Sequence, residues 1–336
     1  MAHPGAVKAL IIAPAWVGDM VMAHTLVQCL VAREPTLELH VAAPPATAAL
    51  ATRMAQVSRV HTVAFPHGEF GWGKRRQLGA ELAEHNYDVA YVLPNSWKSA
   101  LVPYFAGIAR RVGWHGEARF LLLNDRRKLD KARYPLMIER FMALADVAGM
   151  LPAKPYPLPA LQPDPENLQL CLTQLGLQLG KVTALCPGAE FGAAKKWPAE
   201  HYATVARDVI ATGGQVWLMG SPKDQQDCDA IVELAPGCAN LAGRTTLLDA
   251  IDLLSVADQV VCNDSGLMHI ACALGRPTIG VFGSTSPGFT PPLGANAQVV
   301  EMSLDCRPCF QRTCPLGHLD CLNKLSPERV IQVMGQ

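Results

Sequence analysis

The sequence predicts an α/β fold of two doubly wound domains, each with an open parallel sheet, and three observations lead to this prediction. At 336 residues the chain is longer than a single core usually supports. In both halves, short β-branched runs alternate with longer helical patterns, which is typical of parallel α/β layers. Six prolines within residues 151–166 interrupt this alternation. We therefore expect one domain over residues 1–160 and a second over residues 161–336.

The first half alternates between strand and helix patterns from residue 7 onward. Strands are expected at residues 7–13, 37–43, 59–65, 88–94 and 110–114. Helices are expected at residues 19–34, 46–54, 74–85 and 96–107, followed by a long helix over residues 134–150.

The alternation restarts after the proline-rich segment. Strands are expected at residues 181–188, 214–221, 259–265 and 277–284. Helices are expected at residues 198–213, 224–235, 246–257 and 266–275, with a last capped helix at 326–336. Doubly wound sheets bind ligands beyond the carboxyl ends of their strands, so functional residues are expected in the strand-to-helix loops, around a cleft between the domains.

Composition limits the classes of function. The 29 basic and 29 acidic residues balance, so a bulk electrostatic partner such as nucleic acid is not implied. No apolar run reaches the roughly 18 residues of a membrane span, and the first ten residues lack the core of a secretory signal, so a cytoplasmic location is expected. Seven of the 11 cysteines stand singly in apolar segments, as small reduced core residues do. These are Cys29, Cys171, Cys186, Cys228, Cys238, Cys262 and Cys272.

A glycine-rich loop follows the strand at residues 181–188 and enters a helix at Trp197-Pro198. Lys195 and Lys196 stand just before that helix. A lysine on a flexible loop, close to the free N–H groups of a helix start, is well placed to neutralise a diphosphate. The structural alternative is a solvated lysine pair, and the loop lacks the spacing of a Walker motif.

The strand at residues 259–265 passes directly into a helix that carries His269 one turn in. Asp264, Ser265 and the amides around Gly266 stand at the positive end of that helix, which attracts phosphate or ribose oxygens. N-capping by Asp264 and Ser265 is a compatible structural role. For His269 the alternative is a hydrogen-bonded histidine on a helix face.

Asp19 follows the first strand and precedes a helix expected at residues 20–34. Gly18 beside it permits a tight turn. In a doubly wound sheet this position faces the ligand crevice. The carboxylate is therefore either the N-cap of the helix or a general base.

Long blocks of the chain, from residue 7 to about 295, match a known pattern. They include APAWVGDMVM, AYVLPNSWKSALVPYFAGI, CPGAEFGAAKKWP, NDSGLMHIACALGRP and GSTSPGFTPPL. Together they resemble the lipopolysaccharide (LPS) heptosyltransferases of glycosyltransferase family 9, and most of all the type II members. The resemblance implies the GT-B architecture, in which two Rossmann-like domains face a central cleft. The first domain then holds mainly the acceptor, and the second mainly the nucleotide sugar.

The same resemblance implies a reaction. An inverting glycosyltransferase would move L-glycero-D-manno-heptose from ADP-heptose to the heptosyl-Kdo-lipid A inner core during LPS biosynthesis. No cofactor is expected to be required, and a contribution from a divalent metal stays open. The acceptor is a lipid A-linked core oligosaccharide, so the enzyme would be cytoplasmic and in peripheral contact with the inner membrane. In GT-B enzymes a terminal helix often packs back across the hinge, so this is expected of the last helix.

Roles carry over by position. The resemblance makes Asp19 the catalytic base that takes the proton from the acceptor hydroxyl, and Lys195 the lysine that contacts the donor diphosphate. The other donor-binding positions that it implies are Asp264, Ser265, Gly266, His269, Glu190, Phe191, Ser221 and Thr245. Basic residues of the first half would serve the anionic acceptor, and we favour Lys98, Lys74, Arg75 and Arg76. Solvated helix faces are the alternative for these charges.

One region and several functions stay open. Cys306, Cys309, Cys314 and Cys321 stand close together with His318, as the ligands of a structural zinc site can. Their spacing is irregular for such a site, so reduced or partly oxidised cysteines of a surface loop are favoured over zinc. No metal is expected among the catalytic residues. The alternative functions are a heptosyltransferase of type I or III with another core acceptor, and a GT-B-like sugar-nucleotide epimerase. A dehydrogenase is disfavoured because no G-x-G-x-x-G follows the first strand.

Overall fold

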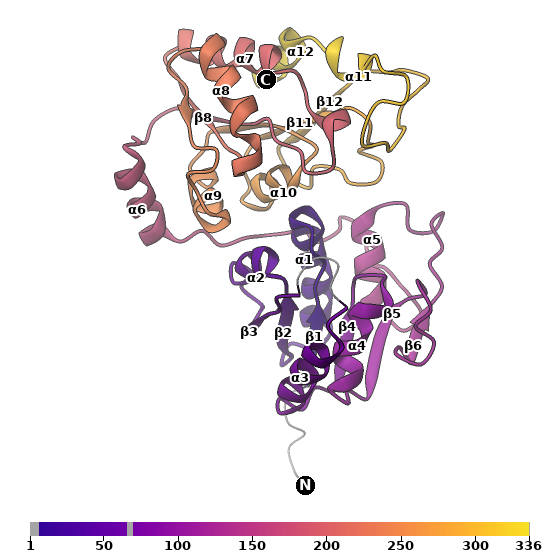
Figure 1. The fold of residues 1–336 in the computed structure, drawn as a ribbon. Helices are drawn as coiled ribbons and strands as arrows, with labels where there is room; N and C mark the ends of the chain where they lie inside the picture. The colour runs from indigo at the N-terminus through magenta and orange to yellow at the C-terminus, as the bar shows by residue number, and fades with distance from the viewer. Residues whose placement is uncertain (1–6, 66–69, 336) are drawn as a thin grey trace. The chain divides into compact units, whose positions relative to one another are not determined.

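The computed structural model describes residues 7–65 and 70–335. The chain divides into two compact units, Met1–Pro159 and Ala160–Gln336, and both are drawn in Figure 1. The division falls inside the proline-rich segment. The first six residues, where a secretory signal was sought, and Gln336, at the end of the last expected helix, lie outside the described residues.

The first unit contains a parallel sheet. Its strands are β1 (Lys8–Ile12), β2 (Glu38–Ala43), β3 (Arg59–Thr62), β4 (Val89–Val92), β5 (Arg110–Trp114) and β6 (Asp125–Arg127). All pair in parallel, in the order β3-β2-β1-β4-β5-β6. Ala9 to Ile12 of β1 are consecutively buried, as expected of a strand that is covered on both faces.

The helices of the first unit form two groups. The helices α1 (Val17–Arg33), α2 (Pro45–Ala51) and α5 (Met137–Met142) pack together. The helices α3 (Trp72–Ala83) and α4 (Trp97–Phe105) also pack against one another. A core cluster joins the sheet to the second group, with Leu10 and Val92 meeting Leu82 and Val102. Two helix groups are what a sheet with two buried faces requires.

The second unit repeats this plan. Its strands are β7 (Val182–Cys186), β8 (Gln215–Leu218), β9 (Ala239–Asn240), β10 (Gln259–Asn263), β11 (Thr278–Phe282) and β12 (Ala297–Glu301). They too pair in parallel, in the order β12-β11-β10-β7-β8-β9. Counted from the first strand of each unit, both sheets have the doubly wound order 3-2-1-4-5-6. The predicted α/β fold class is confirmed.

Helices again form two groups in the second unit. The helix α7 (Ala199–Ala211) contacts α8 (Gln225–Leu234) and α12 (Pro327–Met334). The helix α9 (Leu247–Leu254) contacts α6 (Pro165–Leu175) and α10 (Gly266–Ala273), and the short α11 (Asp320–Asn323) precedes α12. The last helix, for which a place across the hinge was expected, packs on α7, β11 and β12 of its own unit. Its Val330 belongs to the core of that unit.

The long helix expected at residues 134–150 is wrong. The helix α5 ends at Met142 and continues only as the short 3-10 helix η1 (Ala143–Ala145). Strands β6, β9 and β12 and helix α6 were not anticipated either. Each of these strands lies at the edge of its sheet or next to it and carries little of the apolar pattern by which strands are recognised.

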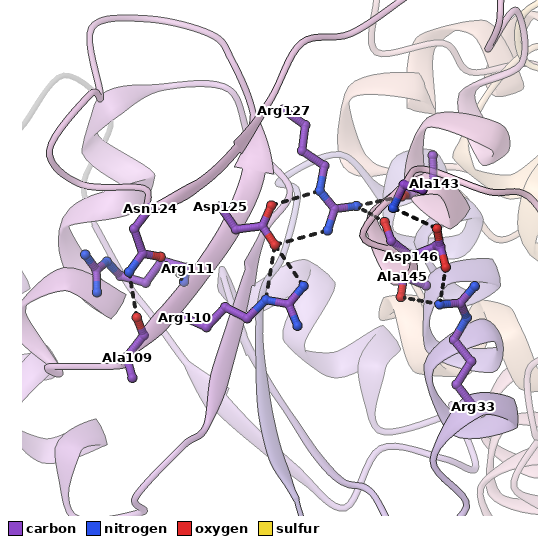
Figure 2. Close-up of polar contacts among 11 residues, drawn as sticks. Arg33, Ala109, Arg110, Arg111, Asn124, Asp125, Arg127, Ala143, Ala145 and Asp146 are labelled. Carbon is purple, nitrogen blue, oxygen red and sulfur yellow. Dashed lines mark hydrogen bonds and ion pairs between the residues drawn. The ribbon is translucent and has the colours of Figure 1, made fainter.

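Arginines from two other elements explain why α5 stops (Figure 2). The guanidinium of Arg127 donates hydrogen bonds to the carbonyl oxygens of Ala143, at 2.8 Å, and of Asp146. Arg33 pairs with the Asp146 carboxylate at 2.7 Å and donates to the Ala145 carbonyl. These contacts hold the carbonyls and the Asp146 side chain in the turn that follows α5 and η1.

Candidate active site

The expected donor residues of the second unit lie at the switch point of its sheet. Strands β7 and β10 are neighbours there, and the crossovers from them lead to opposite sides. Lys195 follows β7, at the end of the 3-10 helix η2 (Ala193–Lys195), and Asp264 follows β10 directly. Ligands of open α/β sheets bind beyond the carboxyl ends of the strands at this place.

Lys195 is held by a buried carboxylate. Its Nζ donates to Oδ2 of Asp264 at 2.6 Å and to the Asp264 carbonyl oxygen at 3.2 Å. The hydroxyl of Thr285, after β11, donates to the same carboxylate oxygen at 2.6 Å. Asp264 is 4% exposed, so the ammonium is fixed at the strand end by a rigid partner. Such a preorganised cation can stabilise negative charge that develops beside it.

The helix α10 begins directly beside this cation. Ser265 occupies its N-cap position, and its hydroxyl makes no capping hydrogen bond in the described chain. Gly266 is the first helical residue. The Asp264 carboxylate turns to Lys195 and Thr285 instead, so the capping expected from the Asp264 and Ser265 side chains is wrong. The backbone N–H groups of the first turn are therefore left to other acceptors.

His269 lies buried in α10, one turn in. Burial lowers its pKa to about 4, with the Lys195 charge acting in the same direction and Asp264 against it. The imidazole is therefore neutral at pH 7. Within the described part of the chain, its buried Nδ1 has no hydrogen-bond partner. The alternative considered from the sequence, a histidine whose ring nitrogens are hydrogen-bonded within the protein, does not hold for Nδ1.

Asn263, at the end of β10, holds the two loops in register. Its side-chain oxygen accepts hydrogen bonds from the Trp197 amide and the Tyr202 hydroxyl, both at 3.1 Å. Its amide group donates to the Pro187 carbonyl at 2.6 Å. Neither Asn263 nor Thr285 was picked out from the sequence as a positioning residue. A buried polar residue at a strand end was the only signal available.

The glycine-rich loop brings an aromatic ring to the cation. The Phe191 ring centroid lies 5.2 Å from Lys195 Nζ and 5.4 Å from the Arg312 guanidinium. The carbonyl oxygen of Arg312 also accepts a hydrogen bond from the Ala194 amide at 3.1 Å. The segment from Cys306 to Cys321, which contains Arg312, thus supports the loop that carries Lys195. The sequence did not indicate this contact. Glu190 points elsewhere, to an exposed ion pair with Lys223 at 3.1 Å.

Ser221 and Thr245 follow the neighbouring strands β8 and β9. Both the backbone amide and the hydroxyl of Ser221 donate to the Asp224 carboxylate, at 2.9 and 2.7 Å. Asp224 in turn lies against Gly188 of the loop after β7, where an added Cβ would approach it to 2.4 Å. Thr245 is half-buried, and its hydroxyl contacts the Leu241 carbonyl at 3.5 Å. Ser221 is thereby connected to the Lys195 loop through Asp224.

In the first unit, Asp19 also lies at a switch point. It follows β1, the neighbour of β4, and is half-buried. It does not precede the helix as expected: α1 begins at Val17, so Asp19 stands in its first turn. The N-cap position is held by Trp16, and the capping role expected as the alternative for Asp19 is wrong. A carboxylate in the first turn is favoured by the helix dipole.

The basic residues expected at the acceptor differ in exposure. Lys74 and Arg76 are exposed on α3. Arg75 is buried: its guanidinium donates to the carbonyl oxygens of Phe70 and Lys98, at 2.9 and 3.1 Å. It therefore ties α3 to α4 rather than reaching solvent. Lys98 is half-buried, with its ammonium 6.0 Å from the Phe70 ring centroid.

The cysteines are all free thiols. Six of the seven expected in the core are buried, and Cys238 is half-buried. Cys306, Cys309, Cys314 and Cys321 line a small hollow together with His318. In residues 7–65 and 70–335, no three His, Cys, Asp or Glu side chains are arranged to hold a metal ion. Among the described residues, the four cysteines and His318 therefore do not form a set of zinc ligands.

Comparison with known proteins decides the family. The model of glycosyltransferase family 9 (heptosyltransferase) matches residues 75–320. The chain belongs to glycosyltransferase family 9. The predicted enzyme class, a glycosyltransferase, is confirmed.

Individual members of family 9 resemble the chain over nearly its whole length. Lipopolysaccharide heptosyltransferase 2 of Escherichia coli (strain K12) is 43% identical over 340 residues, which are 98% of this chain and 97% of the relative. Lipooligosaccharide heptosyltransferase 2 of Haemophilus influenzae is 44% identical over 308 residues, covering 87% and 88%. The solved structure of E. coli ADP-heptose LPS heptosyltransferase II has a TM-score of 0.88 at 41% identity and 98% coverage of both chains. The predicted resemblance to type II LPS heptosyltransferases of the GT-B fold is confirmed.

Proposed function

We propose that this family 9 enzyme transfers L-glycero-D-manno-heptose from ADP-heptose to the heptosyl-Kdo-lipid A inner core, with inversion at the anomeric carbon. The proposal is carried by one observation: Lys195 is fixed by buried Asp264 at the start of α10, at the switch point of the second sheet. The names of its relatives, lipopolysaccharide heptosyltransferase 2 and ADP-heptose LPS heptosyltransferase II, support a heptose as the sugar, ADP-heptose as the donor and LPS as the acceptor.

The leaving group determines what the second unit, Ala160–Gln336, has to provide. Cleavage of the bond between the anomeric carbon and the diphosphate places negative charge on the diphosphate and positive charge on the sugar. Lys195 and the amides that start at Gly266 would stabilise the departing ADP. Neutral His269 would offer a hydrogen bond to a donor oxygen, while Glu190, Phe191, Ser221 and Thr245 would border the nucleotide.

The nucleophile determines what the first unit, Met1–Pro159, has to provide. The Asp19 carboxylate would take the proton of the acceptor hydroxyl as that oxygen attacks from the face opposite the diphosphate. A single displacement of this kind inverts the configuration. Lys98, Lys74 and Arg76 would meet the anionic acceptor, with Arg75 holding the helices that carry them. In this scheme the acceptor oxygen that Asp19 deprotonates replaces, at the anomeric carbon, the diphosphate that Lys195 stabilises.

No metal is required by this scheme, since Lys195 and the start of α10 supply the positive charge for the leaving group. Turnover should therefore be kept in excess EDTA. A fall in turnover that added Mg²⁺ restores would overturn this part of the proposal.

The acceptor also indicates where in the cell the enzyme would act. A lipid A-linked core oligosaccharide is anchored in a bilayer, so we propose a cytoplasmic enzyme in peripheral contact with the inner membrane. Among the described residues, no helix has the length and apolar character to cross a membrane.

Defined acceptors test the assignment. We expect ADP release with ADP-heptose and a lipid A acceptor that carries Kdo and one heptose, and little release with an acceptor that lacks the heptose. The opposite preference would identify a type I enzyme. Incubation with the donor alone separates an epimerase, since only an epimerase would convert ADP-heptose to an isomer.

The change Asp19→Asn tests the base. We expect turnover to fall about 10²- to 10⁴-fold, the usual contribution of general base catalysis, with ADP affinity unchanged by calorimetry. The matched control is Asp208→Asn, the same exchange at an exposed position of α7. It should leave turnover and ADP affinity unchanged. Unaltered turnover in Asp19→Asn would refute the assignment.

A further inference from the structure

Two consecutive hydrophobic side chains of the first unit face solvent. Phe120 is 60% exposed and Leu121 is 85% exposed. They stand in the crossover between β5 and β6 and are called the tip below. Single exposed hydrophobic residues are ordinary, whereas contiguous exposed apolar surface is a feature of interaction sites.

The tip is held in place by its neighbours. Arg119, which is buried, donates hydrogen bonds to the carbonyl oxygens of Pro94, at 2.7 Å, and of Trp114. The amides of Leu122 and Leu123 both donate to the Arg119 carbonyl at 3.2 Å, and Leu123 is buried in the core. The backbone on both sides of the tip is therefore held by hydrogen bonds.

The segment that carries the tip is rich in basic residues, and one of them contacts Phe120. The Arg126 guanidinium lies 4.6 Å from the Phe120 ring centroid. The segment 110–133 contains eight Lys or Arg and three Asp or Glu, although the whole chain has a formal net charge of zero. Arg126, Lys128 and Lys131 are exposed. An apolar tip with a basic border has the composition of a site that enters an anionic lipid surface.

The crossover that carries the tip is anchored at two places on the sheet. Arg119 donates to the Pro94 carbonyl, which follows β4 at the carboxyl end of the strands. The Leu122 carbonyl and the Asn124 side chain bind Arg111, near the start of β5. The tip lies between these two anchors in the sequence.

We propose that Phe120 and Leu121 insert into the interfacial layer of an anionic bilayer, with Arg126, Lys128 and Lys131 at its headgroups. The location rests on the proposed function, because the acceptor is a membrane lipid, but the insertion itself requires no heptose transfer. A second copy of the chain is the less suitable occupant. A symmetric contact through the tip would bring each basic border against its own equivalent.

Vesicle flotation of the full chain tests the proposal. The probes are vesicles of phosphatidylethanolamine with phosphatidylglycerol, and vesicles of phosphatidylcholine alone. We expect the unchanged chain to bind the anionic vesicles, and the double variant Phe120→Ser with Leu121→Ser to bind at least about 10-fold more weakly. Arg126→Gln should weaken binding to the anionic vesicles by a smaller factor.

A matched double variant controls for surface hydrophobicity in general. Leu170→Ser with Leu179→Ser removes two leucines of the second unit that are 57% and 60% exposed, and it should bind like the unchanged chain. Circular dichroism melts establish that all variants fold. The tip variant should also lose turnover on vesicle-embedded acceptor and keep it on acceptor in detergent micelles.

Three results would overturn the proposal. The unchanged chain could fail to float with anionic vesicles, or the tip variant could bind as well as the control. Sedimentation velocity could instead show that the tip variant converts a dimer to a monomer, which would make the tip an interface between copies. Absence of heptose transfer would not affect vesicle binding, so a failure of the proposed function is distinguishable from a failure of this inference.

Discussion

Two adjacent lysines show how far neighbours in sequence can differ in environment. Lys195 pairs with Asp264, whose side chain is 4% exposed, and Lys196 pairs with Asp227, whose side chain is 38% exposed. Both N–O distances are 2.6 Å, so distance does not distinguish the pairs. Burial distinguishes them, because water screens an exposed ion pair, which then contributes little to stability.

Exchange of either lysine for alanine tests this difference. We expect Lys195→Ala to weaken ADP binding at least about 10-fold, which corresponds to about 1.4 kcal/mol, because the cation at the start of α10 is lost. Calorimetric titration with ADP measures it. Lys196→Ala is the matched control and should bind ADP within about 2-fold of the unchanged chain, since surface pairs contribute about 0 to 1 kcal/mol. Equal effects of the two changes would contradict the assignment.

His269 makes stability depend on pH. Its pKa in the folded chain is about 4, below the ordinary 6.5, because burial disfavours the imidazolium. The unfolded chain therefore binds more protons between these values, and folding stability falls as pH drops from about 6.5 toward 4. We expect His269→Gln to reduce the difference in the free energy of unfolding between pH 7 and pH 5 by on the order of 2 kcal/mol.

Urea unfolding at pH 7 and pH 5 measures the effect of His269→Gln. Other buried histidines, His24 and His40 among them, also have lowered pKa values and will keep part of the dependence. The unchanged chain, measured at the same two pH values, supplies the reference slope. An unaltered slope in His269→Gln would show that this imidazole does not stay neutral in the folded chain.

At the scale of elements, Arg127 joins an edge strand to the turn that follows a helix. Arg127 of β6 pairs with the Asp125 carboxylate at 3.1 Å and donates to two carbonyl oxygens beyond α5 (Figure 2). The Asp146 carboxylate then accepts from the amides of Ala148 and Met150, at 2.9 and 3.1 Å. An edge strand and a distant turn are thereby joined by one side chain.

Replacement of Arg127 measures this junction. Arg127→Met should lower the free energy of unfolding by about 3 kcal/mol, because several charged hydrogen bonds are lost and their partners stay half-buried. Its exposed neighbour Arg126 gives the control: Arg126→Met should change stability by less than about 0.5 kcal/mol. Urea denaturation curves compare the two. Similar midpoints would mean that the turn holds without the guanidinium.

At the scale of the whole molecule, both sheets have one strand order, and the candidate residues lie at both switch points. Asp19 follows β1 of the first sheet, and Lys195 follows β7 of the second. The division of labour that we propose assigns the donor to the second unit.

Hydrogen exchange with ADP tests this division. Saturating ADP should slow amide exchange at residues 187–197 and 264–270, because these loops would close on the diphosphate, and should leave β1 to β6 unchanged. Mass spectrometry of peptides measures it, with Lys195→Ala as a control that loses most of the protection. Protection confined to the first unit would reverse the roles of the units.

Local patterns predicted most of the fold. The strands at the centre of each sheet are buried apolar runs, so β1, β4, β7 and β10 could be placed from sequence alone. The edge strand β6 has the sequence Asp-Arg-Arg and β9 has two residues, which no local pattern distinguishes from a loop. The helix expected at residues 134–150 failed because its periodicity holds no information about Arg127.

The sequence by itself determined the α/β alternation, the boundary in the proline-rich segment, and the residue types at the strand ends, including Asp19, Lys195 and Asp264. Only the tertiary structure decided which partners these residues meet. Lys195 and Asp264 are 69 positions apart, and Thr285 is 21 positions beyond Asp264. Their contacts depend on the order of β7, β10 and β11 in the sheet. The physical reason is that periodicity reports burial within one element, whereas a hydrogen bond across a sheet depends on strand order and register.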